Sequence, residues 1–495
     1  MKLAQLFSIY PQLKWGHQRS ADVRFICRDS RLVEPGCVYV AVRGQAHDGH
    51  DFLPQVCRAG AVGVVVESES KIPADYPGAV AVVRDCRKAL DQLASRYYNN
   101  PAASMYCVGV TGTNGKTSLA YLVESILNEY GWSTGVMGTV DHHIGTHVWE
   151  SQLTTPDALD LQKRLVEFKS LGAKAVAFEV SSHALSQFRA DAIPFDAVVF
   201  TNLTRDHLDY HGDLDSYFSA KQRLFDEILW GSEKRDLYAI INRDDPYGRK
   251  LRIADKATRW TYGEREADFC FQIMDQGFSG CRYEIRHPRG VTEISSPLIG
   301  RHNVYNCTAA FAVGLAAGVS SETCATALSR FHGVPGRMER VENQKGIHVF
   351  VDYAHTDDAL KSVLASLNEI RRLSGSTARI ISVFGCGGDR DKGKRPLMAK
   401  AAVEGSDLVF VTSDNPRTED PEEIIQDIFS GIEEGDRDHK VFSEVDRKQA
   451  ISRALRSANS GDVVLIAGKG HEGYQIVGTE KLSFCDVNVV KDLLQ

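Results

Sequence analysis

The sequence predicts an α/β protein built from three domains. Three observations lead to this prediction: a length of 495 residues, apolar runs of strand length, and the alternation of those runs with helical patterns. At about 150 residues per domain, the length corresponds to roughly three domains. Runs that are apolar throughout are typical of parallel strands buried on both faces of a sheet. Their alternation with helices is typical of α/β domains.

The first domain is expected at residues 1–103. Two short β-type runs, at 37–42 and 61–67, lie in this part of the chain. The segment 97–104 then brings Asn, Asn and Pro together, a combination that predicts a linker.

The second domain is expected at residues 104–335, with a mostly parallel sheet of the P-loop type. It opens with an apolar strand, a glycine-rich loop and an apolar-periodic helix, in the order that begins an α/β unit. Glycine and proline near 333–339 predict its end. Its remaining predicted elements are strands at 173–180, 196–203 and 236–242 and an Ala-rich helix at 303–318.

The third domain, 336–495, is predicted to be Rossmann-like. Four apolar runs alternate with helical patterns in it, as expected for a doubly wound parallel sheet. These runs lie at 347–353, 378–385, 407–413 and 462–468.

Composition and charge exclude several classes of protein. The net charge of −7 disfavours a nucleic-acid partner. No apolar stretch approaches the roughly 18 residues that span a bilayer, and the first residues do not resemble a signal peptide. Eleven cysteines without a C-x-x-C pair indicate free thiols in a reducing compartment. We therefore expect a soluble, cytoplasmic protein that is not inserted in a membrane, and we expect a monomer.

A glycine-rich loop at the start of the second domain predicts a phosphate site. Glycines let backbone amides approach a phosphate, and the following helix N-terminus favours negative charge. Lys116 would neutralise phosphate charge, and Thr117 would offer its hydroxyl to Mg²⁺. Val110 occupies the position of the first glycine in the usual pattern, so a simple helix-capping turn is the alternative. The predicted loop residues are Gly112, Thr113, Asn114, Gly115, Lys116, Thr117 and Ser118.

Polar residues follow the next two strands. Glu179 ends one strand, and the loop 201–212, which contains His207, is dense in His and Asp. Side chains at the carboxyl ends of parallel strands lie beside the crevice where ligands bind. The alternative is a polar loop whose histidines are satisfied within the protein.

Lys221 occupies an unusual position in its helical pattern. It lies three residues from Phe218 and Leu224, and four from Tyr217 and Phe225. This spacing places the lysine on the apolar stripe of the helix. A charged ammonium there is unfavourable unless it is paired or chemically altered.

These motifs resemble those of the Mur ligases and their folylpolyglutamate synthetase relatives. The loop spelling TGTNGKTS at 111–118 is similar to that of the family. The resemblance implies an enzyme that uses ATP to convert a carboxylate into an acyl phosphate, which an amine then attacks. It also implies that Thr117 and Glu179 bind one Mg²⁺, while His207 and a carbamylated Lys221 hold a second.

The resemblance also assigns nucleotide contacts outside the loop. Asn306 corresponds to the family residue that reads adenine, Arg337 to a phosphate-contacting arginine, and Asp352 to a ribose-side residue. The family continues this last motif with Thr-Pro-Asp, whereas this chain has Thr356-Asp357-Asp358.

Further family positions imply a UDP-muramyl dipeptide as substrate. In the first domain, Ser30 and the turn Gln45, Ala46 and His47 would contact the UDP sugar. Residues of the second domain would hold the sugar peptide: Thr154, Thr155, Ser181, Gln187 and Arg189.

The motif Asp414-Asn415-Pro416-Arg417 separates members of the family. It marks enzymes that add meso-diaminopimelate, which differs from lysine by one carboxylate. Arg417 and Arg390 would pair with that carboxylate, because a guanidinium fork matches carboxylate geometry. Gly468 and Glu472 complete the implied pocket, with Glu472 facing an ammonium. As a bare motif, it would be a capped turn with a surface arginine.

Taken together, these resemblances to the Mur ligases imply an ATP-dependent amide ligase of peptidoglycan precursor synthesis. It would add meso-diaminopimelate to the D-Glu of UDP-N-acetylmuramoyl-L-Ala-D-Glu. D-Glu has two carboxylates, and the family uses the γ-carboxylate. A folylpolyglutamate synthetase is one alternative, and a P-loop regulator that binds ATP without forming a bond is another.

Overall fold

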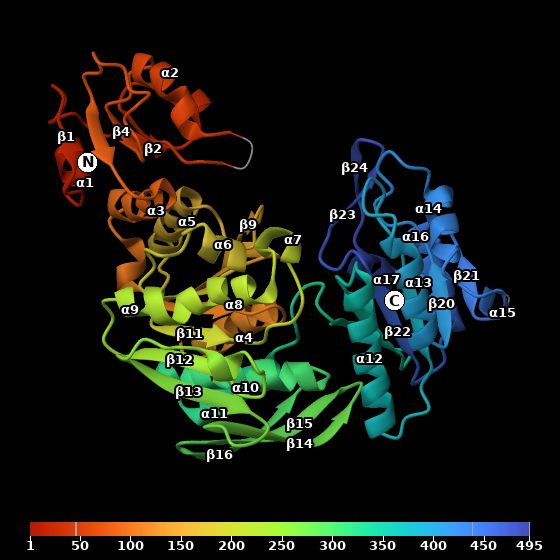
Figure 1. Ribbon diagram of the computed structural model, residues 1–495. Coiled ribbons are helices and arrows are strands. Elements are labelled where there is room, and N and C mark those ends of the chain that lie inside the picture. The colour runs from red at the N-terminus through yellow and green to blue at the C-terminus, as the bar shows by residue number, and fades with distance from the viewer. Residues whose placement is uncertain (45–46, 438, 495) are drawn as a thin grey trace. The chain divides into compact units, whose positions relative to one another are not determined.

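The computed structural model describes residues 1–44, 47–437 and 439–494, and its chain forms two compact units. Unit 1 comprises Met1–Tyr262 and Ala312–Val319, and unit 2 comprises Gly263–Phe311 and Ser320–Gln495. Both are α/β, as predicted (Figure 1).

Unit 1 begins with a five-stranded sheet of order β1-β5-β4-β3-β2, in which all but β1 run parallel. Hydrophobic side chains cover both faces, because strands β2 to β5 are apolar throughout. The elements are α1 (Leu3–Phe7), β1 (Leu13–Lys14), β2 (Phe25–Cys27), β3 (Cys37–Val40), α2 (Leu53–Arg58), β4 (Gly63–Val66), β5 (Ala79–Val82) and α3 (Cys86–Tyr97).

The second sheet of unit 1 has five parallel strands in the order β12-β11-β6-β10-β7, with β13 parallel beside β12. The hairpin β8–β9 extends the edge at β7 in antiparallel fashion. The strands are β6 (Tyr106–Thr111), β7 (Thr134–Met137), β8 (Asp141–Ile144), β9 (His147–Glu150), β10 (Ala175–Glu179), β11 (Ala197–Phe200), β12 (Leu237–Asn242) and β13 (Ala257–Gly263). The helices are α4 (Lys116–Glu129), α5 (Ala158–Ser170), α6 (Ser182–Ser186), α7 (Leu208–His211), α8 (Leu214–Arg223) and α9 (Leu229–Gly231).

Unit 2 contains an antiparallel meander that the sequence analysis did not predict. Its strands are β14 (Phe269–Gly277), β15 (Gly280–His287) and β16 (Gly290–Ser296). Buried and less buried residues alternate along β15, so the strand lacks the continuous apolar run used to find the others. Helix α11 (Ser321–Arg330) packs against β16, and α10 (Arg301–Ala316) has residues in both units.

The rest of unit 2 is a six-stranded sheet of order β17-β18-β22-β19-β20-β21, parallel except for β17. The four predicted apolar runs are its four central strands. Helices pack on both faces, and a hairpin, β23–β24, follows β22 (Figure 1). The strands are β17 (Glu339–Val341), β18 (His348–Asp352), β19 (Ile380–Phe384), β20 (Leu408–Val411), β21 (Val441–Ser443), β22 (Val463–Ala467), β23 (Tyr474–Val477) and β24 (Glu480–Ser483). The helices are α12 (Asp357–Leu373), α13 (Lys394–Gly405), α14 (Pro421–Phe429), α15 (Glu434–Arg437), α16 (Arg447–Ser457) and α17 (Asp486–Leu494).

The expectations of free cysteines and of no membrane-spanning segment can be compared with the structure. All eleven cysteines are free, and only Cys57, Cys270 and Cys485 are partly exposed. Among the described helices, none is long and apolar enough to cross a bilayer.

Candidate functional site

The predicted phosphate loop joins β6 to α4, and its glycines are required by its conformation. Gly112 and Gly115 have φ angles of 149° and 86°, which side chains rarely adopt. A Cβ on Gly112 would lie 1.9 Å from the Thr201 hydroxyl oxygen. The loop is tied to the end of the neighbouring strand, because the amide of Thr113 donates to the Asn202 carbonyl over 2.8 Å. The first turn of α4 then presents amide donors, the usual anion site of a helix N-terminus.

Two lysines converge on this loop. The ammonium nitrogens of Lys116 and Lys221 each lie 2.9 Å from the carbonyl oxygen of Gly112. The periodicity prediction for Lys221 is confirmed, since its exposed fraction is 1% and its Nζ lies 4.5 Å from the ring centre of Tyr217. Burial, and then the charge of Lys116, holds the pKa of Lys221 well below that of an ordinary lysine. The Lys221 amine is therefore more easily deprotonated than that of an exposed lysine.

Glu179, at the end of β10, is a buried carboxylate held by neutral donors. Its exposed fraction is 1%. Its Oε1 accepts from the Thr139 amide over 2.7 Å, and its Oε2 accepts from the hydroxyls of Thr117 and Thr139 over 3.0 and 3.1 Å. The two predicted metal ligands Thr117 and Glu179 thus lie together. Ser118 follows in the first turn of α4 and is half-buried.

His207 immediately precedes α7, as its N-cap residue, and has a left-handed conformation with a φ of 53°. It is exposed, and its ring packs edge-on against His183 with 4.9 Å between centroids. Tyr217 connects it to Lys221, because the Tyr217 ring lies 6.1 Å from the His207 ring and also contacts the Lys221 amine.

The Glu179 carboxylate and the Thr117 hydroxyl fit a Mg²⁺ ion that takes most of its ligands from water and substrate. A buried carboxylate beside a hydroxyl offers hard oxygen donors, and Mg²⁺ usually keeps several waters and binds substrate phosphates. Within the described residues, no group of three or more His, Cys, Asp or Glu side chains forms a self-sufficient metal site.

The predicted sugar-peptide residues of the second domain form one hydrogen-bonded cluster. The Thr155 hydroxyl donates to the Glu179 carbonyl over 2.7 Å and accepts from the Ser181 amide over 3.0 Å. Arg189 donates to the Thr155 carbonyl and to the Gln187 amide oxygen. The cluster therefore adjoins the candidate metal ligands, and Thr154 joins it through the Thr139 hydroxyl at 3.1 Å.

Residues of the first sheet approach this cluster in part. Arg28, two residues before Ser30, forms a 2.8 Å ion pair with Asp157, which caps α5. Ser30 begins a short 3-10 helix. No recorded contact within the described residues links Ser30 itself to the cluster.

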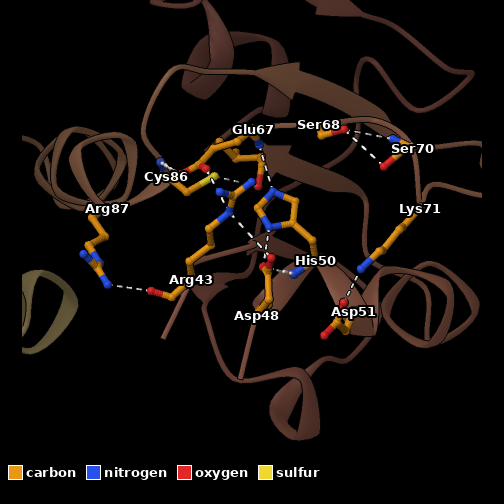
Figure 2. A network of polar contacts seen from close by, with 12 residues as sticks. Arg43, Asp48, His50, Asp51, Glu67, Ser68, Ser70, Lys71, Cys86 and Arg87 are labelled. Atoms are coloured by element: carbon orange, nitrogen blue, oxygen red, sulfur yellow. Dashed lines mark hydrogen bonds and ion pairs between the residues drawn. The ribbon is translucent and has the colours of Figure 1, made fainter. Parts of the chain in front are cut away.

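His47 lies in a turn that is anchored by a buried histidine. Figure 2 shows His50 between Asp48 and Glu67: its Nδ1 is 2.7 Å from the Asp48 carboxylate, and its Nε2 accepts from the Glu67 amide over 2.9 Å. The His47 carbonyl accepts from the Gly44 amide. Gln45 and Ala46, also predicted to contact the UDP sugar, lie outside the described residues.

In unit 2, Arg337 and Asp352 lie beside each other. Asp352 is buried at the end of β18 and accepts from the amides of Met338 and Ala354 over 2.7 and 2.9 Å. The Arg337 guanidinium lies 5.0 Å from the ring centre of Tyr353. Burial raises the pKa of Asp352 above its ordinary value.

Asn306 lies within α10, which begins at Arg301. Its side chain is buried and donates weakly to Asn303 over 3.5 Å.

The Asp414–Arg417 motif follows β20 and meets the loop after β22. Lys469, which is fully buried, lies 3.1 Å from both the Asn415 amide oxygen and the Glu472 carboxylate. The Asn415 amide also donates to Glu472 over 3.0 Å. A Cβ on Gly468 would lie 2.7 Å from the Asp414 carboxylate, so glycine is needed there. Asp414, Asn415, Gly468 and Glu472 are thus brought together as predicted.

Arg417 and Arg390 lie on facing loops, and no ion pair with a carboxylate is recorded for either in the described chain. Arg417 donates to the Gly388 carbonyl over 2.8 Å, and Arg390 donates to the Asp389 carbonyl over 3.2 Å. Pro416, which directly precedes Arg417, is buried. Its carbonyl oxygen lies so close to Gly388 that a Cβ on Gly388 would be 1.8 Å from it. The arrangement offers two guanidinium groups to an anion.

Two residues that hold these sites were missed from the sequence. Thr139 makes two hydrogen bonds to Glu179 across 40 residues of chain, and no local pattern singles it out. Lys469 is separated from the apolar strand β22 by Gly468 alone, and this position close to a buried strand could have indicated that the lysine is buried.

Comparison with known proteins places the chain in a family. Three family models match it: "Mur ligase family, catalytic domain" over residues 22–98, "Mur ligase middle domain" over 110–314 and "Mur ligase, glutamate ligase domain" over 336–470. A protein of Geobacter metallireducens is 43% identical over 501 residues, which cover 98% of this chain and 97% of the relative. The chain belongs to the Mur ligase family. A second relative, from Geobacillus thermodenitrificans, is 40% identical and is covered to 99%, as is this chain.

Both of these Mur ligases are named UDP-N-acetylmuramoyl-L-alanyl-D-glutamate--2,6-diaminopimelate ligase. A solved structure of the same name has a TM-score of 0.74 and 33% identity, with 100% of this chain and 99% of that chain covered. A MurF structure from Acinetobacter baumannii has a TM-score of 0.63 at 20% identity, covering 100% and 98%, and supports the Mur ligase fold alone.

Proposed function

We propose that this chain is an ATP-dependent, ADP-forming ligase of peptidoglycan precursor synthesis. It joins meso-diaminopimelate to the D-Glu γ-carboxylate of UDP-N-acetylmuramoyl-L-Ala-D-Glu. The observation that carries the proposal is a cluster of charged residues in unit 2. A Cβ on Gly387 would lie 2.9 Å from the Arg417 guanidinium and 3.8 Å from the Arg390 side chain, and the buried Asp414 and the half-buried Glu472 belong to the adjoining loops. Such a site suits an amino acid with an ammonium and an additional carboxylate. The names of full-length relatives support the same substrate.

The work is divided among three domains, at 1–103, 104–335 and 336–495. Three main sheets, and three family matches at 22–98, 110–314 and 336–470, support this division. The first domain binds the UDP sugar, the second binds ATP, and the third binds the incoming amino acid.

ATP binds at the loop 112–118, where Lys116 neutralises charge on the β- and γ-phosphates. Asn306 contacts adenine, Arg337 a phosphate and Asp352 the ribose. The burial of Asp352 beside the Arg337–Tyr353 pair supports its role as an acceptor for hydroxyls.

Thr117 and Glu179 would hold one Mg²⁺, and His207 with a modified Lys221 would hold a second. When bound, the ions would offset the negative charge that opposes attack of a carboxylate on a phosphate. The buried Glu179, which accepts only from neutral donors in the recorded contacts, supports this assignment.

Lys221 is suited to carbamylation. Its uncharged amine attacks the carbon of CO₂, the nitrogen loses a proton to solvent, and an anionic carbamate results. A pKa below that of an ordinary lysine favours the free amine, and the carbamate places a metal-binding anion at this buried position.

The sugar peptide is held by Ser30 and the turn 45–47 of the first domain, and by the cluster around Thr155. Within that cluster Arg189 supplies positive charge near the reacting carboxylate. The γ-carboxylate of D-Glu attacks the γ-phosphorus of ATP, ADP leaves, and an acyl phosphate forms. The free amine of diaminopimelate attacks the acyl carbon, loses a proton, and expels phosphate.

The closing test is phosphate release from ATP with UDP-N-acetylmuramoyl-L-Ala-D-Glu, comparing meso-diaminopimelate with L-lysine. Turnover that requires diaminopimelate is expected, because lysine leaves the paired arginines without an anion and such sites discriminate by about 10⁴-fold or more. Equal turnover with lysine would refute the specificity. Release with neither amino acid would refute the ligase and favour a P-loop regulator.

A further inference from the structure

The two arginines of the proposed amino-acid site, Arg390 and Arg417, belong to different loops. The distance between them therefore depends on contacts that join one loop to the other. Arg390 follows β19, and Arg417 follows the neighbouring parallel strand β20. In each loop one residue has a left-handed backbone: φ is 53° at Asp389 and 52° at Arg417. Such conformations are unfavourable for residues other than glycine and persist where surrounding contacts enforce them.

Glu419 supplies the contacts that join the loops. Its Oε1 accepts from the Asp389 amide over 2.6 Å, next to Arg390. The preceding residue, Thr418, donates its hydroxyl to the Asp389 carboxylate over 2.7 Å and its amide to the same group over 3.2 Å. The loop after β20 thus holds the loop after β19 at Asp389, through both its backbone amide and its side-chain carboxylate.

Glu419 is itself fixed by a buried cation. Arg395, whose exposed fraction is 0%, donates to both carboxylate oxygens of Glu419 over 3.0 Å. It also donates to the Gly387 carbonyl over 3.3 Å, and Lys392 adds an ion pair to Glu419 at 3.1 Å. The Arg395 guanidinium, followed by the Asp389 amide, lowers the pKa of Glu419 to about 2, so this carboxylate is ionised at any working pH.

We propose that Glu419 is a positioning residue for substrate specificity: it presets the spacing of Arg390 and Arg417 for the second carboxylate of the diamino acid. It would not touch the substrate. The inference rests on the proposed function of the pocket. It assigns the discrimination between diaminopimelate and lysine to a preorganised pair of loops, since two donors fixed before binding lose less entropy when the ligand binds.

The test is Glu419→Gln, assayed with both amino acids. If the glutamine oxygen takes the Oε1 position, the negative charge is lost and an N–H group faces the Arg395 guanidinium, donor against donor; in the opposite orientation the contact to the Asp389 amide is lost. We expect kcat/KM for meso-diaminopimelate to fall about 10- to 100-fold, the range for loss of a charged hydrogen bond. The KM values for ATP and the UDP substrate, and the low rate with lysine, should stay within about threefold, the scatter of sites that do not interact.

Asp427→Asn is the matched control. Asp427 forms an ion pair with the second terminal nitrogen, Nη1, of Arg395 over 2.7 Å, and among the described residues it makes no hydrogen bond to the loop that carries Arg390. It should leave the diaminopimelate-to-lysine ratio unchanged. Thr418→Val removes only the hydroxyl contact to Asp389, so it should shift the ratio in the same direction by a smaller factor, even if Glu419→Gln fails to fold.

An equal loss with both amino acids, or an equal effect of Asp427→Asn, would overturn the positioning role. An unchanged ratio in both Glu419→Gln and Thr418→Val would do the same. If the wild-type chain lacks diaminopimelate-dependent turnover, the proposed function fails instead, and that result appears before any variant is measured.

Discussion

Substitution of Lys221 separates its chemical role from its contribution to stability. The amine has no recorded carboxylate partner in the described structure, and its acceptor, the Gly112 carbonyl, also accepts from Lys116. Lys221→Met keeps the apolar stem and leaves no buried charge unpaired. We therefore expect its free energy of unfolding to stay within about 1 kcal/mol of wild type, since only one hydrogen bond is lost.

Lys221→Ala instead removes buried methylenes and opens a cavity beside Tyr217. At about 0.8 kcal/mol per methylene plus a cavity term, the loss should be about 2–4 kcal/mol. Both variants should lose phosphate release by at least about 10²- to 10³-fold, because a preorganised charge is missing from the site.

The assay compares the two variants with added acetate or formate, with chloride at equal ionic strength as the control. A short carboxylate can enter the cavity of Lys221→Ala and replace the carbamate, whereas the methionine side chain fills that space. We expect partial recovery of Lys221→Ala only. Near-wild-type activity of Lys221→Met, or a complete lack of rescue by any carboxylate, would refute the reasoning, while mass spectrometry of the wild type would detect the added CO₂ directly.

Three further predictions concern charged groups elsewhere. Lys469→Met should raise the KM for diaminopimelate about 10- to 100-fold and leave that for ATP unchanged, because Glu472 loses its cation; equal changes in both KM values would contradict this. Asp486→Asn leaves the buried Arg447 guanidinium without its anion and should cost about 3–5 kcal/mol in urea unfolding, whereas a loss below about 1 kcal/mol would be inconsistent with the fully buried pair. Hydrogen bonds from His143 to the carboxylates of Asp141 and Glu124 outweigh burial and raise the pKa of His143 to about 9. Since the folded-state pKa is raised, this stability is fully present below about pH 6.5, falls as pH rises through about 9, and amounts to about 3 kcal/mol; urea unfolding of His143→Gln should lack that dependence, and an unchanged slope would disprove it.

The sequence by itself determined the parallel strands, the phosphate loop and the buried position of Lys221. Each depends on neighbours within a few residues: continuous apolar runs, glycines before a helix, and spacings of three and four. The strands β14 to β16 escaped the same reasoning because their exposed faces interrupt the apolar pattern.

Only the tertiary structure decided which side chains meet. Thr139 holds Glu179, which is 40 positions later in the sequence. Lys469 joins Asn415 to Glu472, and Asn415 precedes it by 54 positions. Glu419 holds the loop of Asp389, which precedes it by 30 positions. The register of parallel strands brings their carboxyl ends to one edge, and this register depends on the packing of the whole sheet. Local periodicity can therefore predict the elements and several reactive residues, but the contacts that position those residues arise only when the sheets assemble.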